Sequence, residues 1–193
     1  MGKVIFVISM SLDGYITASN QTTENPMGDG GLRLQEWAFG TDETNRRYLD
    51  RAIDGLGAVI AGRRTYDTSL PWWGADGPSG SARRPVFVVT HEAPADSPEG
   101  GVYQFVTDGL KSAVKQAQAA AGDNDVTVMG GADVGRQCLA AGLLDEMEIH
   151  LVPVLFGGGT PMFDVLPDGH AQLEAVDVLP TPSATHLRYR IVR

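Results

Sequence analysis

The stretch VIAGRRTY, residues 59–66, passes from an apolar run into a glycine, two arginines and a threonine. Its apolar part predicts a short buried strand over 58–61, and a short helix can follow. Gly62 lets the backbone approach a ligand closely, and Thr65 lies near a helix start whose free N–H groups attract phosphate. Arg63 and Arg64 add charged donors that suit phosphate geometry. This stretch is therefore either a phosphate-binding turn or a solvated turn with surface arginines.

A second stretch, VTVMGGADV at residues 126–134, has the same organisation. It predicts a buried strand over 126–129, the pair Gly130 and Gly131, and a helix over 132–141 whose start favours an anion. It matches neither the G-x-G-x-x-G fingerprint nor a phosphate-binding loop with its lysine. Taken alone it is either a second anion site or a tight strand-to-helix turn. Two such turns in one small chain favour a dinucleotide with several phosphates.

The rest of the chain continues this alternation of strands and helices. We expect further strands over 4–10, 86–89, 102–106, 146–154, 173–179 and 186–192. We expect helices over 42–54, capped by Thr41 or Asp42, and from a cap at Asp108 to 121. We also expect a polar loop over 20–31 and a loop over 71–81 that contains two tryptophans. The alternation predicts an α/β fold with a mixed, mostly parallel sheet, helices on both faces and an antiparallel C-terminal edge. We expect a single domain over residues 1–193.

Composition narrows the class of protein. The 193 residues include 24 Asp and Glu against 15 Lys and Arg, and the net charge of −9 argues against nucleic acid as a partner. No apolar run reaches the length of a membrane span, so we expect no membrane partner. The single cysteine, Cys138, cannot form an intramolecular disulfide and is expected to be buried, which favours a reducing cytoplasm. No grouping of His, Cys and carboxylates has metal-ligand spacing, so we expect no metal.

The ordered set of motifs resembles the dihydrofolate-reductase superfamily. The likeness is closest to the reductase domain of the bifunctional riboflavin-biosynthesis deaminase-reductases and their stand-alone relatives. It is carried by residues 11–16 (SLDGYI), 61–66 (AGRRTY), 88–91 (VVTH), 129–132 (MGGA), 143–146 (LLDE) and 151–159 (LVPVLFGGG). The resemblance implies the three-layer dihydrofolate-reductase-like fold and NADPH as cofactor. It also implies hydride transfer to a small heterocycle, either pterin- or dihydrofolate-like or similar to 5-amino-6-(5-phosphoribosylamino)uracil.

The resemblance also implies roles for particular residues. Those that border the nicotinamide would be Met10, Ser11 and Gly14. The pyrophosphate and the 2′-phosphate would be held by Gly62, Arg63, Arg64 and Thr65, and from the other side by Gly130, Gly131, Ala132 and Asp133. Thr90 and His91 would flank the adenosine ribose, although a capped loop start also explains this pair.

Two carboxylates are candidates for the catalytic proton donor, and water is the alternative source. Asp13 follows the first strand, but Asp-Gly is also a strong turn dipeptide. Glu36 lies in residues 32–40, the region that would carry the pterin-orienting acid of true dihydrofolate reductases, but it also reads as a surface helix residue. The loop over 20–31 has glycines that would allow it to close over a site.

The same patterns leave two alternative functions open, and we also expect a particular oligomeric state. The chain would be a non-catalytic NADP(H)-binding module if catalysis were lost, or a flavin-binding module if the phosphate turns held that nucleotide. The resemblance, together with an apolar strand over 149–156, predicts a homodimer.

Overall fold

The structure, a computed structural model, describes residues 2–164 and 170–192. The chain divides into two compact units, Met1–Phe6 with Ala52–Leu144 and Val7–Arg51 with Asp145–Arg193. Strand β1 (Val4–Ser11) and helix α2 (Glu43–Gly55) each contribute residues to both units. None of the helices in the described ranges is long and apolar enough to cross a membrane.

The first unit is built on a parallel sheet. Its strands are β3 (Leu56–Gly62), β4 (Val86–Val89), β5 (Tyr103–Val106) and β6 (Asp125–Met129), in the order β5-β4-β3-β6 followed by the start of β1. Strand β3 pairs in parallel with β4 and β6, and β4 pairs in parallel with β5. The register sets Gly62 opposite Val89 and Ala61 opposite Met129. The carboxyl ends of three strands therefore lie at one edge of the sheet.

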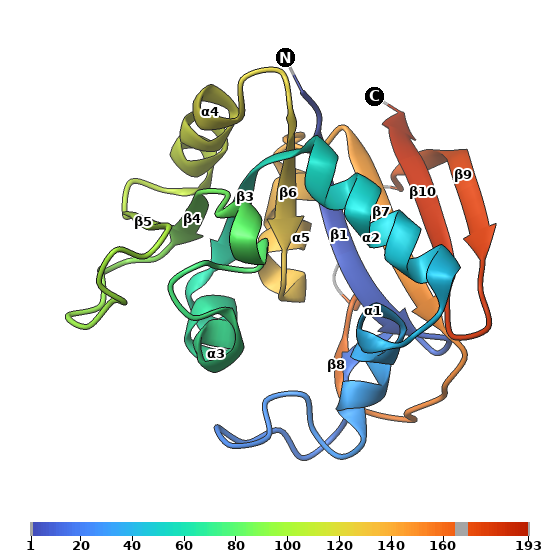
Figure 1. Ribbon diagram of the computed structural model, residues 1–193. Helices are drawn as coiled ribbons and strands as arrows, with labels where there is room; N and C mark the ends of the chain where they lie inside the picture. The colour runs from blue at the N-terminus through green and yellow to red at the C-terminus, as the bar shows by residue number, and fades with distance from the viewer. Residues whose placement is uncertain (1, 165–169, 193) are drawn as a thin grey trace. The chain divides into compact units, whose positions relative to one another are not determined.

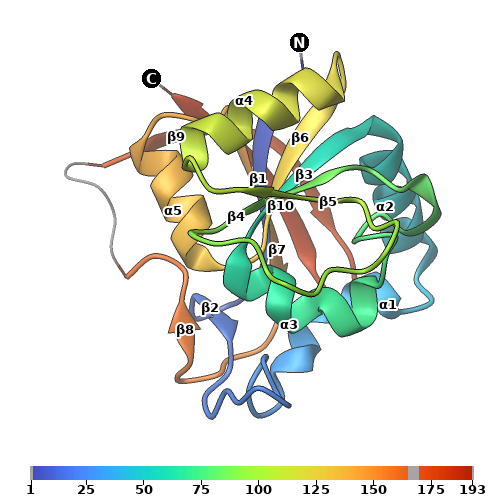
Figure 2. The same cartoon turned by 90° about the vertical axis from the view of Figure 1, so that its left-hand side faces the viewer.

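Helices cover both faces of this sheet, as the alternating sequence predicts. They are α3 (Arg63–Trp73), α4 (Leu110–Ala121) and α5 (Ala132–Ala140), with a short 3-10 helix η2 (Gly80–Ala82). The connection from β3 to β4 and the one from β5 to β6 run in opposite directions along the sheet, so right-handed crossovers place α3 and α4 on opposite faces. Figure 2 shows α4 above β4 and β5, and α3 below them.

The second unit ends in antiparallel strands. The order is β1, β7 (Glu146–Val152), β10 (Thr185–Val192) and β9 (Gln172–Pro180), and β10 is antiparallel to both neighbours (Figure 1). A small sheet pairs β2 (Tyr15–Thr17) with β8 (Thr160–Pro161). The helical elements are η1 (Gly31–Gln35), α1 (Glu36–Phe39) and most of α2. The Asn45 N–H donates to the Asp42 carboxylate at 2.9 Å, which confirms Asp42 as the cap of α2.

Three local expectations are wrong, two of them at helix ends. Helix α3 continues through Trp73, where a loop over 71–81 was expected from Pro71. Leu70 and Trp73 pack on the buried apolar cluster of this unit, and this burial outweighs the one N–H that proline lacks. Asp108 does not cap α4, because Gly109 with φ 98° intervenes and the Asp108 carboxylate accepts from the Ser112 hydroxyl at 2.7 Å.

The third concerns the apolar segment 149–156. Strand β7 ends at Val152, whereas we expected a strand over 146–154 and, for the dimer, an apolar strand that continues to residue 156. Pro153 has no N–H to continue a ladder, and the Val154 N–H folds back on the Val152 carbonyl at 2.8 Å. Strand β7 lies between β1 and β10 and is largely buried, so it offers no free edge for a second chain.

Candidate functional site

Three turns of the first unit follow strands that end at the same edge of the sheet. The first turn begins at Gly62, the last residue of β3, and runs to residue 65. Residues 90–91 follow β4, and residues 130–133 follow β6. The parallel register of β3 with both neighbours aligns these strand ends. In open parallel sheets, ligands bind beyond the carboxyl ends of the strands. The structure therefore brings together all of the residues predicted for the phosphates and the adenosine ribose.

Thr65 joins two of these turns directly. Its Oγ1 accepts the Gly131 N–H at 3.0 Å. Gly130 has φ 92°, and a Cβ at this position would lie 2.3 Å from Thr65 Cγ2. A Cβ on Gly62 would lie 2.9 Å from Val134 Cγ2. These glycines are required by the packing of one turn on the other, a reason that the local sequence does not reveal.

Both helices at this edge begin without a side-chain cap. Helix α3 starts after Gly62 and α5 after Gly131, and in the described part of the chain no side chain bonds to the first N–H groups of either helix. The Asp133 carboxylate accepts from Gln137 at 2.8 Å, within α5. Free N–H groups and the helix dipole together make each helix start a favourable place for an anion.

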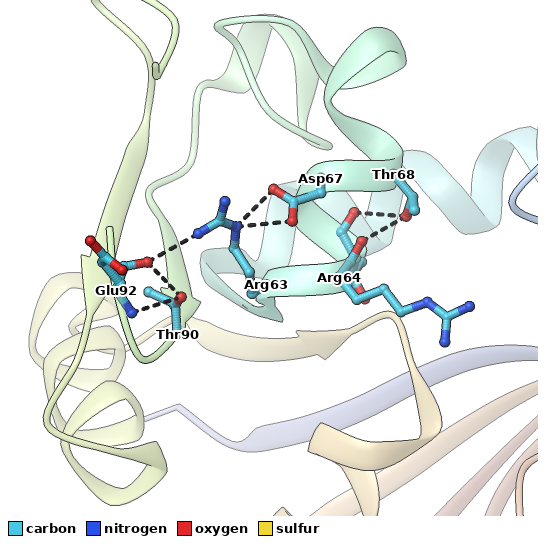
Figure 3. A network of polar contacts seen from close by, with 7 residues as sticks. Arg63, Arg64, Asp67, Thr68, Thr90 and Glu92 are labelled. Carbon is cyan, nitrogen blue, oxygen red and sulfur yellow. Dashed lines mark hydrogen bonds and ion pairs between the residues drawn. The ribbon is translucent and has the colours of Figure 1, made fainter. Parts of the chain in front are cut away.

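The two arginines have different surroundings, as Figure 3 shows. Arg63 Nε donates to both Asp67 oxygens at 2.8 and 2.9 Å, and its Nη1 donates to the Glu92 carbonyl at 3.0 Å. The Asp67 hydrogen bond raises the pKa of Arg63, which therefore stays cationic. The Arg64 guanidinium points away from this network and has no hydrogen bond or ion pair with any residue that the structure describes. Arg64 is exposed and available to an anion, whereas the Arg63 guanidinium is held by Asp67 and the Glu92 carbonyl.

Thr90 forms a capped loop start. Its hydroxyl donates to the Glu92 carbonyl at 2.8 Å and accepts the Glu92 N–H at 3.3 Å (Figure 3). This agrees with the second interpretation of residues 90–91 given above, a capped loop start. His91, the next residue, is exposed. The proximity of Thr90 and His91 to a ribose stays a prediction.

The residues expected near the nicotinamide lie in the second unit, at the end of β1. The Ser11 hydroxyl donates to Asp13 at 2.6 Å, and the Asp13 carboxylate also accepts the backbone N–H groups of Phe156 at 3.1 Å and Gly157 at 2.7 Å. These hydrogen bonds, that of Ser11 first, lower the pKa of Asp13. Asp13 is therefore a carboxylate that fixes a turn, and it is a poor proton donor. Gly14 has φ 90°, as expected for an Asp-Gly turn.

Glu36 lies on the surface of the second unit. It is the first residue of α1, its side chain is exposed, and its carboxylate lies 3.7 Å from the Arg33 guanidinium. The neighbouring residue Trp37 is the buried one, and its indole N–H donates to Ser9 Oγ at 3.0 Å. This is the surface position that one interpretation predicted, and a catalytic role for Glu36 stays a prediction.

Sequence analysis missed a buried polar cluster in the second unit. The Nδ1 atoms of His150 and His186 are 2.9 Å apart, and His186 Nε2 is 2.9 Å from the Asn45 amide oxygen. Burial, followed by the nearby His186, lowers the pKa of His150 to about 3. Tyr48 stacks on His186 with ring centres 4.3 Å apart and donates its hydroxyl proton to Glu148. No local signal could have found this cluster, because its members come from α2, β7 and β10.

Two further expectations concern Cys138 and metals. Cys138 is fully buried, as expected, and burial raises the pKa of its thiol to about 12. Over residues 2–164 and 170–192, no group of three or more His, Cys, Asp or Glu could hold a metal ion.

Comparison with known families and structures adds the following. The sequence model of the RibD C-terminal domain matches residues 2–187. A putative riboflavin biosynthesis protein from Shewanella sp. PV-4 is 24% identical, with a TM-score of 0.73 over 99% of each chain. RibD from Acinetobacter baumannii is 19% identical, with a TM-score of 0.68 over 100% of this chain and 59% of that one. Curated protein sequences gave no match.

Dihydrofolate reductase from Enterococcus faecalis, solved in complex with NADP(H) and RAB-propyl, shares the same fold. It is 15% identical, with a TM-score of 0.61 over 98% of this chain and 96% of that one. The mixed α/β fold of the dihydrofolate-reductase type expected from the sequence is thereby confirmed.

Proposed function

Because this chain belongs to the RibD C-terminal domain family, we propose that it is an NADPH-dependent reductase acting on a small heterocyclic substrate. Membership of this family supports an oxidoreductase activity for the chain. The substrate class that we propose is a ribosylaminopyrimidine or a pterin, after the riboflavin-biosynthesis and dihydrofolate-reductase relatives.

The observation that carries the NADPH proposal is the strand edge of the first unit. Two uncapped helix starts, the Thr65 hydroxyl and the unpaired Arg64 guanidinium belong to the turns at this edge, and all of them are groups that bind phosphate. Thr65 accepts from Gly131 and so keeps its own O–H proton to donate to a phosphate oxygen. Arg63 lies beside the loop after β4, where a 2′-phosphate on the adenosine ribose would be read.

NADPH supplies the hydride when it is bound, so the protein needs only to bind, orient and exclude water. Asp13 holds the backbone of residues 156–157 in place and stays ionised, and Glu36 is a surface residue. We therefore assign the substrate proton to water rather than to either carboxylate. The roles of Met10, Ser11 and Gly14 at the nicotinamide remain part of this proposal.

Titration of the protein with NADPH, NADH and flavin mononucleotide tests the proposal. We expect NADPH to bind most tightly, and Arg64→Ala to weaken it about tenfold or more, because a charged hydrogen bond to phosphate is lost. Arg46→Ala is the matched control, since Arg46 is also exposed and lies on α2 of the second unit.

Three results would count against the proposal. Equal NADPH affinity in Arg64→Ala and the unaltered protein would contradict a phosphate-binding site at Arg64. Tighter binding of flavin mononucleotide would favour a flavin-binding module. Tight NADPH binding without oxidation of NADPH by any pterin or ribosylaminopyrimidine would favour a non-catalytic binding module.

A further inference from the structure

The ion pair between Arg63 and Asp67 lies one helical turn into α3, beside the edge that we assign to phosphates. Asp67 takes the Nε side of the guanidinium with both oxygens, at 2.8 and 2.9 Å, and the Glu92 carbonyl takes Nη1 at 3.0 Å. Nη2 has no hydrogen bond to a residue within the described ranges. Figure 3 shows Arg63 held from two sides, by Asp67 and by Glu92.

This ion pair is easily exchanged. The side chains of Arg63 and Asp67 are 38% and 48% exposed, and ion pairs at such positions stabilise proteins only weakly. The Glu92 carbonyl is uncharged and continues to orient the guanidinium if the carboxylate is displaced. A phosphate can therefore replace Asp67 as the anionic partner of Arg63 at little cost to the fold.

The carboxylate has opposite effects on two kinds of nucleotide. A 2′-phosphate carries about two negative charges, so an ionised Asp67 beside Arg63 repels it and neutralises part of the charge that attracts it. A ribose with a free 2′-hydroxyl has no charge to repel, and a carboxylate accepts a hydrogen bond from it. The negative charge of Asp67 therefore acts against the nucleotide that carries a 2′-phosphate, and not against the one with a free 2′-hydroxyl.

We propose that Asp67 is a specificity-determining residue that limits the preference of this protein for NADPH over NADH, by competing with the 2′-phosphate for Arg63. The inference rests on the proposed function, because it needs the adenosine end of the nucleotide to lie at Arg63. Asp67 acts through Arg63, and removal of its charge makes the protein more selective for NADPH.

Asp67→Asn tests this inference, because asparagine keeps an acceptor oxygen for Arg63 Nε and removes only the charge. Calorimetric titration should show NADPH binding about three- to tenfold more tightly in the variant. NADH affinity should stay the same or fall slightly, because the amide oxygen of asparagine still accepts from a 2′-hydroxyl but carries no charge. The gain should shrink as salt is raised, because the repulsion between exposed charges is screened. Glu43→Gln is the matched control, since Glu43 forms an exposed i,i+4 ion pair with Arg47 in the second unit.

The outcomes separate the inference from the proposed function. If the unaltered protein binds neither nucleotide, or prefers NADH, the proposed function fails and the inference fails with it. If the unaltered protein prefers NADPH but Asp67→Asn has the same or a lower NADPH-to-NADH ratio, only the inference fails. A rise of the ratio in Glu43→Gln equal to that in Asp67→Asn would make the effect one of net charge, and would also overturn it. Melting temperatures of both variants check that they are folded.

Discussion

At the scale of single residues, the buried Tyr66 and the partly buried Tyr48 differ in whether their hydroxyl has a partner. Tyr66 is 1% exposed, and its hydroxyl is buried without a hydrogen bond among the described residues, inside an apolar cluster with Tyr103 and Phe105 around it. Tyr48 donates to the buried carboxylate of Glu148. A buried polar group without a partner costs free energy, whereas a partnered one becomes costly only when its partner is removed.

We therefore expect Tyr66→Phe to leave the free energy of unfolding unchanged or to raise it by up to about 1 kcal/mol. Tyr48→Phe should lower it by about 1–3 kcal/mol, because Glu148 loses a donor in a buried position. Urea denaturation of both variants measures the two values side by side. A clear loss of stability in Tyr66→Phe would mean that its hydroxyl has a partner, such as an ordered water.

Arg63, which is paired with Asp67, and Arg64, which is unpaired, show how neighbouring residues of one type acquire different roles. Arg63 and Arg64 are equivalent in the sequence, but only Arg63 has an acid one turn later on its own side of α3. The proposals for Arg64 and Asp67 both follow from this difference.

At the scale of elements, α2, β7 and β10 share the buried histidine pair. His150 and His186 face each other across the β7–β10 register, and Asn45 of α2 bonds to His186. Burial lowers the pKa of both imidazoles, with Asp42 acting in the opposite direction on His186. Tyr48, which donates to Glu148, also packs against both imidazole rings. The packing of these three elements therefore requires neutral histidines.

The stability of this region should depend on pH near neutrality. His150 has a pKa of about 3 in the folded protein and near 6.5 when unfolded, so the unfolded chain binds more protons between these values. The contribution of neutral His150 to the free energy of unfolding should be fully present above about pH 6.5. It should fall as the pH is lowered, by at most about 1.4 kcal/mol per pH unit for this residue. Urea denaturation between pH 7 and pH 5 measures the slope above the range in which most carboxylates titrate.

Two histidine variants separate this effect from other titrations. His150→Asn should flatten the slope, and His91→Asn should not, because His91 is exposed. An unchanged slope in His150→Asn would show that the pair does not govern the pH dependence.

At the scale of the whole molecule, the proposed homodimer needs a surface other than β7, which is interior. Strand β9 is the last in the order of its sheet, and nearly all of its residues are exposed. Leu173, Val176 and Val178 expose 39%, 43% and 54% of their surface. An exposed edge with apolar side chains is a common place for a second chain to bind.

We expect light scattering at micromolar concentration to give twice the mass of one chain, and Val178→Lys to shift it toward the monomer. A lysine on an edge strand opposes pairing with another strand. Leu32→Lys is the control, because Leu32 is 63% exposed but lies on η1. A monomer in the unaltered protein would contradict the dimer, and an effect of Leu32→Lys alone would contradict the role of β9.

The sequence alone determined the order and type of most of the longer strands and helices and the placement of both glycine turns at helix starts, but it did not predict the short elements β2, β8, η1, α1 and η2. These features follow from local rules, because apolar periodicity, glycine and a capping aspartate act within a few residues. Buried β3 with Gly62 at its end, and α2 with Asp42 before it, were predictable for this reason. Family resemblance then supplied the fold and the expected cofactor.

Only the tertiary structure decided which side chains meet. Thr65 meets Gly131 across 66 residues, Asp13 meets Gly157 across 144, and His186 meets Asn45 across 141. Tertiary burial also decided where α3 ends, since the packing of Leu70 and Trp73 carries the helix past Pro71. The physical reason is common to all of these. Local propensity acts along the chain, whereas these contacts form when distant segments fold together and bury their surfaces against one another.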